Sequence, residues 1–322
     1  MVNIIEGIVG RDGTGFNRGK NIPLGIALAG LEEGVITASK AKYCGGAYQL
    51  PNHSHRFRDW RRGGHGRVDL EKAIVESCDV YFYDLAHHLG IDRMHDFLTE
   101  FHFGRGTGID LAGERGGLLP SRDWKRRVRN QAWFPGETLI VGIGQGAFLA
   151  TPLQLAAATA AIANGGRYLD PRVAKALDAG QGQIEPVQAP RRDLGLDPDH
   201  VEDIIQAMTQ VVESPRGTAR RIRSPAYRIA GKTGTAQVFT VGQKETYKEK
   251  QVAARKRDHA LFVAFAPVED PRIAVAVLVE NGGHGGSVAA PIARAVMDSY
   301  LLGQEPPGDL DAEPEEEAED GD

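Results

Sequence analysis

Two apolar runs near the C-terminal end of the chain constrain its fold more than any other feature. They are HALFVAFA, residues 259–266, and IAVAVLV, residues 273–279. Runs of this length and composition are typical of strands, and a short connection that starts at Pro267 separates them, so we predict two neighbouring strands. With the helical patterns elsewhere, they predict an α/β chain: an antiparallel sheet flanked by helices, with an inserted all-helical lobe.

A third predicted strand carries polar residues suited to chemistry. Residues 230–237 read AGKTGTAQ and follow the apolar-flanked run Tyr227–Ala230, which predicts a strand edge built of small residues around Lys232. Small residues let another backbone come close and leave main-chain N–H groups free to point at a ligand. A lysine and two threonines beside such amides suit a carboxylate and a developing oxyanion. The alternative is a Gly-rich turn between two strands.

A helical run, residues 69–88, supplies a second group of polar residues. Its apolar side chains recur at helical spacing, which predicts one helix over the whole run. Ser77 and Asp79 lie on this helix, on either side of Cys78. Because Ser77 shares a stripe with the apolar residues, the alternative to a catalytic role is a small buried hydroxyl bonded back to its own helix.

Local signals predict the remaining elements. Apolar periodicity and end signals favour further helices, whereas a stretch rich in Gly, Gln and Pro predicts a linker. The predicted helices cover about residues 24–33, 92–101, 152–162, 199–213 and 287–302, the linker covers 177–198, and the basic stretch around 124–133 is expected to be loop-rich.

Ser77-x-Asp79 and Lys232-Thr233-Gly234 together resemble the penicillin-recognising serine enzymes, which join Ser-x-x-Lys, Ser-x-Asn or Ser-x-Asp, and Lys-Thr-Gly motifs around one cleft. Longer segments resemble the penicillin-binding protein 2 family, the class B enzymes of cell elongation. These segments are Tyr48–Asn52, Arg58–Trp60, Gly64–Gly66, Ile143–Gly146, Ala163–Gly166 and Asp258–Ala260. The resemblance covers about residues 24–302, the transpeptidase domain, and leaves an atypical segment 1–23 and a tail 303–322. It implies a D,D-peptidase/β-lactamase-like fold.

For an intact member, the resemblance implies a D,D-transpeptidase that lies in the periplasm and is anchored in the inner membrane. It would act on peptidoglycan stem peptides, bind β-lactams, need no cofactor for catalysis, and work with membrane proteins of the elongation complex. By position, Ser77 would relay a proton toward the leaving group, and Asp79 would bind substrate or lysine. Lys232 and Thr233 would orient the substrate carboxylate, and the Thr235 amide would supply one oxyanion donor.

The Ser-x-x-Lys motif of the family is missing from its expected place. In the family, Gly-Ser-Thr-x-Lys-Pro opens the first helix, whereas this chain has RGKNIP at residues 18–23. Counting back from Pro23 puts Gly19 at the serine and Ile22 at the lysine. We therefore expect that acylation is lost, and that the start of the chain is truncated or shifted relative to the family.

One other stretch, Ser39-Lys40-Ala41-Lys42, matches Ser-x-x-Lys. The chemistry needs the serine at a helix N-terminus with the lysine one turn later, so that a neutral amine can take the hydroxyl proton. Ser39 instead follows the first predicted helix, in a short segment before Gly45. We predict that Ser39 is not a replacement nucleophile.

Both cysteines of the chain, Cys44 and Cys78, lie near the Ser77 motif, with Asp59 and His65 between them. Thiolate, imidazole and carboxylate are ligands of closed four-coordinate zinc sites, although this spacing matches no short zinc-finger pattern. The resemblance implies a structural zinc at these four positions, with Cys44 where an aspartate often stands. A disulfide between the two cysteines, or two unrelated buried thiols, are the alternatives.

Charge separates the tail from the rest of the chain. The formal net charge is −5, and residues 303–322 hold ten acidic and no basic residues, so the remainder carries about +5. We predict a disordered, solvated tail. The basic clusters at 56–67 and 122–129 match no nucleic-acid module, so we expect no nucleic-acid partner. We identify no signal peptide or transmembrane run in the sequence.

Two other functions remain open. A β-lactamase-like hydrolase would use the same cleft with a water-activating carboxylate, for which we find no signature. A noncatalytic, zinc-stabilised domain that binds a partner requires only that the fold persists without the nucleophile.

Overall fold

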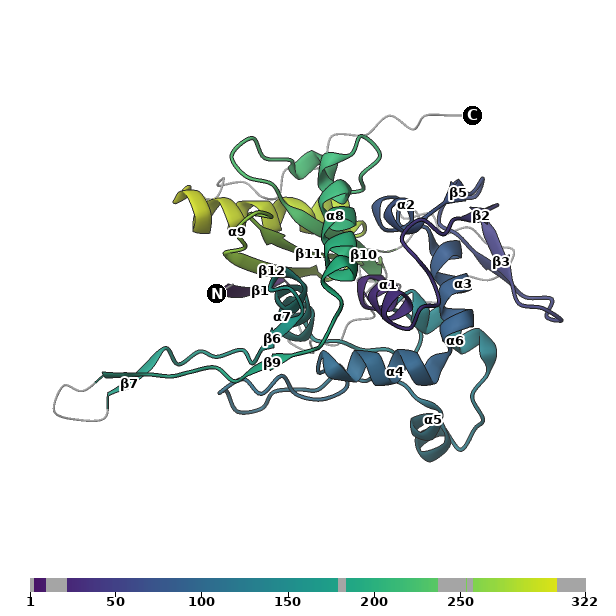
Figure 1. The fold of residues 1–322 in the computed structure, drawn as a ribbon, viewed down its shortest axis with the longest axis horizontal. Coiled ribbons are helices and arrows are strands. Elements are labelled where there is room, and N and C mark those ends of the chain that lie inside the picture. Colours follow the sequence, from purple (N-terminus) through teal and green to yellow (C-terminus); the bar gives the residue numbers. More distant parts are fainter. Residues whose placement is uncertain (1–2, 10–21, 179–183, 237–252, 254–256, 306–322) are drawn as a thin grey trace.

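The computed structural model describes residues 3–9, 22–178, 184–236, 253 and 257–305 (Figure 1). Its main sheet has four strands in the order β1-β12-β11-β10. They are β1 (Asn3–Val9), β12 (Ile273–Val279), β11 (His259–Ala266) and β10 (Ala230–Ala236). The two strands predicted from the apolar runs are therefore neighbours, and the strand that carries Lys232 is at one edge.

The sheet is antiparallel except at the edge formed by β1. β10 pairs with β11 and β11 with β12 in antiparallel register, whereas β1 runs parallel to β12. No hairpin turn links β1 to β12, so turn geometry does not impose an antiparallel direction on this pair. The predicted antiparallel sheet is confirmed for three strands, and its fourth strand makes the sheet mixed.

Helices cover the sheet on both sides. α7 (Pro152–Ala163) packs on β1, β11 and β12, and α9 (Ala290–Leu302) packs on β11 and β12. Figure 1 shows these two helices on opposite faces of the sheet. Nearly every described side chain of β11 and β12 is buried, which explains why both strands are continuous apolar runs rather than alternating ones.

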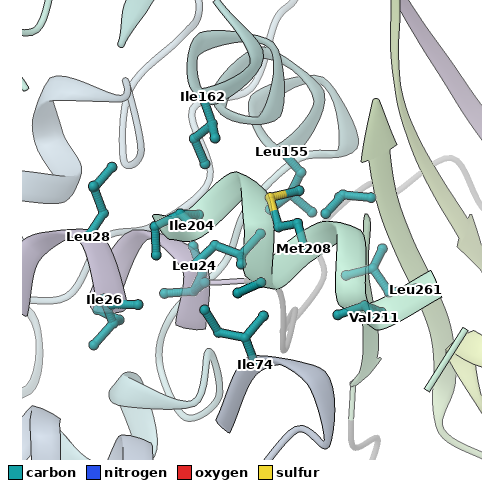
Figure 2. Close-up of a cluster of buried hydrophobic side chains, with 14 of the residues drawn as sticks. Leu24, Ile26, Leu28, Ile74, Leu155, Ile162, Ile204, Met208, Val211 and Leu261 are labelled. Atoms are coloured by element: carbon teal, nitrogen blue, oxygen red, sulfur yellow. The ribbon is translucent and has the colours of Figure 1, made fainter. Parts of the chain in front are cut away.

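A helical lobe packs beside the sheet. It contains α1 (Pro23–Glu32), α2 (Leu70–Val75), α3 (Asp79–Leu89), α4 (Ile91–Glu100), α5 (Arg122–Arg129) and α6 (Pro135–Gly142). α8 (Pro198–Glu213) contacts α1, α2 and β10, so it lies between the lobe and the sheet. Figure 2 shows Met208 and Ile204 of α8 among side chains from α1, α2 and α7. This shared apolar core fixes the position of the lobe relative to β10.

Among the residues that the structure describes, four short strand pairs lie outside the main sheet. They are β2 (Lys42–Cys44) with β5 (Gly66–Val68), β3 (Ala47–Gln49) with β4 (Arg56–Arg58), β6 (Arg167–Leu169) with β9 (Arg191–Asp193), and β7 (Ala176–Asp178) with β8 (Ile184–Pro186). In Figure 1, β7 projects far from the body. The prediction of a linker over 177–198 is wrong where β8 pairs with β7 and β9 pairs with β6, because backbone pairing orders these segments without an apolar face.

The single helix predicted over residues 69–88 is also wrong. Helix α2 ends at Val75 and α3 begins at Asp79. Between them Ser77 has φ +53°, in the left-handed region, and Cys78 is extended. The Cys78 N–H bonds to the Ala73 carbonyl at 3.0 Å and closes the turn. The apolar periodicity continues across this break, and so the pattern did not reveal it.

The helices predicted near residues 24, 92, 152 and 199 are confirmed to within two residues at their ends. Within the described residues, no helix is long and apolar enough to cross a membrane.

Candidate active site

Ser77 and Lys232 meet although they come from different parts of the fold. The Lys232 ammonium on β10 donates a hydrogen bond to the Ser77 hydroxyl at the α2–α3 break, and a second one to the Thr233 carbonyl at 2.9 Å. Lys232 is only 2% exposed, so its charge relies on such partners. The two motifs expected to share a cleft are thus adjacent, and the Ser77 hydroxyl faces the sheet rather than its own helix.

The β10 side of the site is tightly packed. The Thr233 hydroxyl lies 2.8 Å from that of Thr218, in the turn after α8. The π-helical turn η4 (Gly285–Ala289) closes over the strand: a Cβ on Gly285 would lie 2.4 Å from the Gly234 carbonyl oxygen. Only glycine allows this approach. Thr235 is half-buried and pairs with Ala260 of β11, and its role as an oxyanion donor stays a prediction.

Asp79 is the first residue of α3 and is 6% exposed. Its carboxylate accepts the backbone N–H of Trp60 at 3.2 Å. An acidic residue in the first turn also suits the positive end of the helix dipole. Asp79 therefore anchors the start of α3 within one residue of the Ser77 turn.

Two contacts at this site escaped the sequence analysis. Glu76, with 7% of its side chain exposed, pairs with Arg216 (Nε to Oε1, 3.2 Å) and with Arg61 (Nη1 to Oε2, 3.7 Å). Arg216 and Thr218 sit in a turn that connects α8 toward β10, and nothing in that turn's sequence marks it as part of a site. Only the packing of α8 between α2 and β10 brings it there.

The second Ser-x-x-Lys match has other partners. Ser39 is exposed in a turn, and its hydroxyl lies 3.5 Å from that of Thr37. Lys42 forms an ion pair with Asp84 at 3.0 Å, and Lys40 donates to a backbone carbonyl. These contacts agree with the prediction that Ser39 is not the nucleophile.

The position expected for the family lysine is apolar. Ile22 is 2% exposed and borders a cavity of about 30 Å³ whose walls include Phe101, Leu155 and Val263. Val263 lies directly opposite Lys232 in the β10–β11 register, so this cavity is next to the site. Gly19, which the register places at the serine, lies outside the described residues.

The four candidate metal ligands form one buried cluster. Their ligand atoms all lie within 4.8 Å of one another. Cys44 Sγ is 3.6 Å from both Asp59 Oδ2 and His65 Nδ1, and Cys78 Sγ is 3.4 Å from Asp59 Oδ2. Zinc bonds of about 2.0–2.3 Å place tetrahedral donors about 3.3–3.8 Å apart. The donor set and its spacing fit a zinc ion, and both thiols are free.

Hydrogen bonds set the charge of the cluster. Burial raises the pKa of Asp59, but hydrogen bonds from His65 and from the backbone amides of Val80 and Arg61 outweigh it, so this pKa lies below its usual range. Burial, and then the Asp59 carboxylate, raise the pKa of the Cys78 thiol. The cluster thus combines a carboxylate with a thiol, that of Cys78, whose ionisation a bound cation would favour.

Comparison with known proteins places these features in context. The family described as "Penicillin binding protein transpeptidase domain" matches residues 24–298. The peptidoglycan D,D-transpeptidase MrdA of Acinetobacter baumannii is 48% identical over 279 residues, which cover 86% of this chain and 41% of that protein. MrdA of Haemophilus influenzae is 42% identical over 280 residues, or 86% of this chain and 43% of that protein. This chain therefore spans less than half the length of these relatives.

Solved structures of penicillin-binding proteins also match this chain. Pseudomonas aeruginosa PBP2 in complex with WCK 5153 matches with a TM-score of 0.78 and 47% identity, over 93% of this chain and 62% of that chain. PBP2 from Helicobacter pylori in a complex with MreC matches with a TM-score of 0.76 and 34% identity, over 89% of this chain and 50% of that chain.

Proposed function

The chain belongs to the penicillin-binding protein transpeptidase family, and on that premise we propose that it is the transpeptidase domain of an elongation-type peptidoglycan D,D-transpeptidase. The two relatives with that name described above are 48% and 42% identical to it. The expected D,D-peptidase/β-lactamase-like fold is confirmed by the structural matches. The substrates would be peptidoglycan stem peptides, and β-lactams would occupy the same cleft.

The contact between Lys232 and Ser77 is the observation that carries this proposal. It joins two of the three family motifs across 155 residues. A buried ammonium that holds a hydroxyl is suited to proton transfer and to binding a carboxylate. Thr233, held against Thr218, would add a hydroxyl donor for the same carboxylate.

The roles at the cleft follow from these positions. Lys232 and Thr233 would orient the carboxylate at the D-alanyl-D-alanine end of the stem peptide, and Ser77 would relay a proton to the leaving amine. The Thr235 amide would donate to the oxyanion. In intact relatives, a serine would take the acyl group and pass it to an amine on a neighbouring strand.

We propose further that this chain does not acylate. Gly19, at the position expected for the family serine, has no hydroxyl. Ile22, at the position expected for the family lysine, is an apolar residue that lines an apolar cavity. Loss of the nucleophile typically costs many powers of ten in rate. Fluorescent-penicillin labelling of the purified chain tests this, and we expect no covalent band. A band that disappears in a Ser39→Ala variant would overturn the proposal.

We also propose that Cys44, Asp59, His65 and Cys78 hold a structural zinc ion. When bound, the ion would offset most of the negative charge of the cluster and fix the loop of Asp59 against α3. Because Cys78 lies between Ser77 and Asp79, this cluster would hold the second motif in place.

The zinc cluster also favours a second candidate, a noncatalytic domain stabilised by zinc that binds a partner. A chain that holds zinc and binds no β-lactam would favour this candidate. A β-lactamase-like hydrolase is a third alternative, and rapid nitrocefin turnover would be needed to support it.

We propose a periplasmic location and partners among the membrane proteins of the elongation complex. The matched Helicobacter pylori PBP2 structure is a complex with MreC, and another matched structure is described as a peptidoglycan synthase complex. Co-purification with membrane proteins from an envelope extract tests the proposal, and recovery of cytoplasmic partners alone would contradict it.

A further inference from the structure

The break between α2 and α3 leaves backbone groups that a continuous helix would satisfy. Ser77 adopts φ +53°, which is unfavourable for a residue that carries a Cβ atom. The Glu76 and Ser77 carbonyls no longer follow the helical ladder, and such groups need partners when they are shielded from water. The Cys78–Ala73 hydrogen bond closes the turn but leaves these two carbonyls to partners outside the two helices.

Trp60 supplies these partners. Its indole N–H lies 3.1 Å from the Glu76 carbonyl oxygen and 3.0 Å from that of Ser77, in one bifurcated hydrogen bond. Its backbone N–H donates to the Asp79 carboxylate at 3.2 Å. A single residue from the loop after β4 thus binds Glu76, Ser77 and Asp79, and the neighbouring Asp59 contacts Cys78 between them.

We propose that Trp60 is a positioning residue that holds the Ser77 backbone in its left-handed conformation, so that the hydroxyl meets Lys232. This inference rests on the proposed function only in giving Ser77 a catalytic task. The contacts by which Trp60 holds the turn are all made between atoms of this chain.

The exposure of Trp60 indicates that its side chain acts through hydrogen bonding more than through burial. The side chain is 57% exposed, although its ring lies edge-on to His65 with centroids 5.5 Å apart. A tryptophan so exposed contributes less through burial than one in the core. Its indole N–H is the group that the turn uses, and phenylalanine would keep most of the ring contact but lose that donor.

Trp60→Phe tests the proposal, with Trp133→Phe as the matched control. The Trp133 indole N–H donates to the Thr138 hydroxyl at 2.8 Å, so the control also loses one indole hydrogen bond. The readouts are amide hydrogen exchange at Cys78 and Val80 and the 13C shifts of Ser77 in serine-labelled protein, assigned with Ser77→Ala. Both use the full chain without ligand.

In Trp60→Phe, we expect amide exchange at Cys78 and Val80 to become roughly five- to tenfold faster, as for the loss of one hydrogen bond. We also expect the Ser77 13C shifts to leave the range of left-handed backbone. Trp133→Phe should change neither. Unchanged exchange and shifts in Trp60→Phe, or equal changes in the control, would overturn the proposal.

A second variant keeps the test valid should Trp60→Phe fail to fold. Trp60→benzothienylalanine retains the size of the bicyclic ring and replaces the N–H by sulfur. The same loss of protection at the Ser77 turn is expected, and wild-type behaviour would overturn the proposal. Failure of the chain to bind any β-lactam would count against the proposed function and leave these readouts unaffected.

Discussion

The Lys232 ammonium donates a hydrogen bond to the hydroxyl of Ser77, a residue 155 positions earlier in the chain. Lys232 lies on the edge strand β10, and Ser77 lies in the break between α2 and α3. The core around α8 holds these two elements together. This pair defines the candidate active site, and the first prediction concerns its cation.

Replacing Lys232 should weaken noncovalent β-lactam binding. A hydrogen bond to a charged group contributes about 1.5–3 kcal/mol, so Lys232→Ala should raise the Kd for benzylpenicillin roughly 10- to 100-fold. Isothermal titration calorimetry measures the change. Lys42→Ala is the control, because Lys42 is 40% exposed and pairs with Asp84. Equal affinities for the wild-type and Lys232→Ala proteins would contradict the assignment of this cleft.

Metal should copurify with the chain in a ratio of about one zinc per protein. The cluster around Asp59 is buried and loses its compensating charge without a cation, so chelation should lower the melting temperature by several degrees. Cys44→Ala should remove most of the zinc, whereas His88→Ala, at an exposed position, should not. Elemental analysis together with melting curves checks both points. If chelation leaves the melting temperature unchanged, the two cysteines would be ordinary buried thiols rather than metal ligands.

The stability of the fold should fall in mild acid partly because of His259. Burial lowers the pKa of His259, and this effect exceeds the opposite influence of Glu280 and Asp258. The Asn281 N–H donates to its Nδ1 at 2.8 Å, which requires an unprotonated nitrogen. Because the folded-state pKa lies below the unfolded value near 6.5, the unfolded chain binds more protons as the pH falls. Stability should therefore decline as the pH falls below about 7.

Urea denaturation at several pH values measures this slope. His259→Gln should flatten the decline relative to the wild-type chain, whereas His53→Gln, at an exposed position, should leave it unchanged. An identical slope in the His259 variant would assign the acid sensitivity to other groups.

Ile22 should contribute to stability rather than to catalysis. Its side chain is 2% exposed in an apolar cavity, so Ile22→Ala should cost about 2–4 kcal/mol of unfolding free energy. Leu111→Ala, at a site 56% exposed, should cost less than about 0.5 kcal/mol. Chemical denaturation compares the two variants. A small effect at Ile22 would indicate that this side chain does not fill the core.

Some elements followed from local sequence signals. Thr151 caps α7 and Gln154 reaches back to complete the capping box, with Pro152 in the first turn. Such signals act within one helical turn, and so they survive without tertiary information. α5 has similar signals in Ser121 and Asn130, but its polar sequence offers no apolar stripe, and the periodicity argument missed it.

Other features needed contacts that no local pattern encodes. At the α2–α3 break, the Ser77 carbonyl accepts a hydrogen bond from Trp60, which lies 17 positions away. The contacts of Arg216 and Thr218 with the site depend on how α8 packs. In each case the sequence supplied the residues, but their partners are distant along the chain.

The sequence by itself determined three strands of the sheet, most of the helices and the residue types of both motifs. These are properties of composition, spacing and register, which act locally. The tertiary structure alone decided that Ser77 leaves its helical stripe to meet Lys232, and that Cys44, Asp59, His65 and Cys78 gather in one cluster. Both outcomes follow from long-range packing, because a left-handed serine and a buried carboxylate persist only where neighbouring elements compensate them.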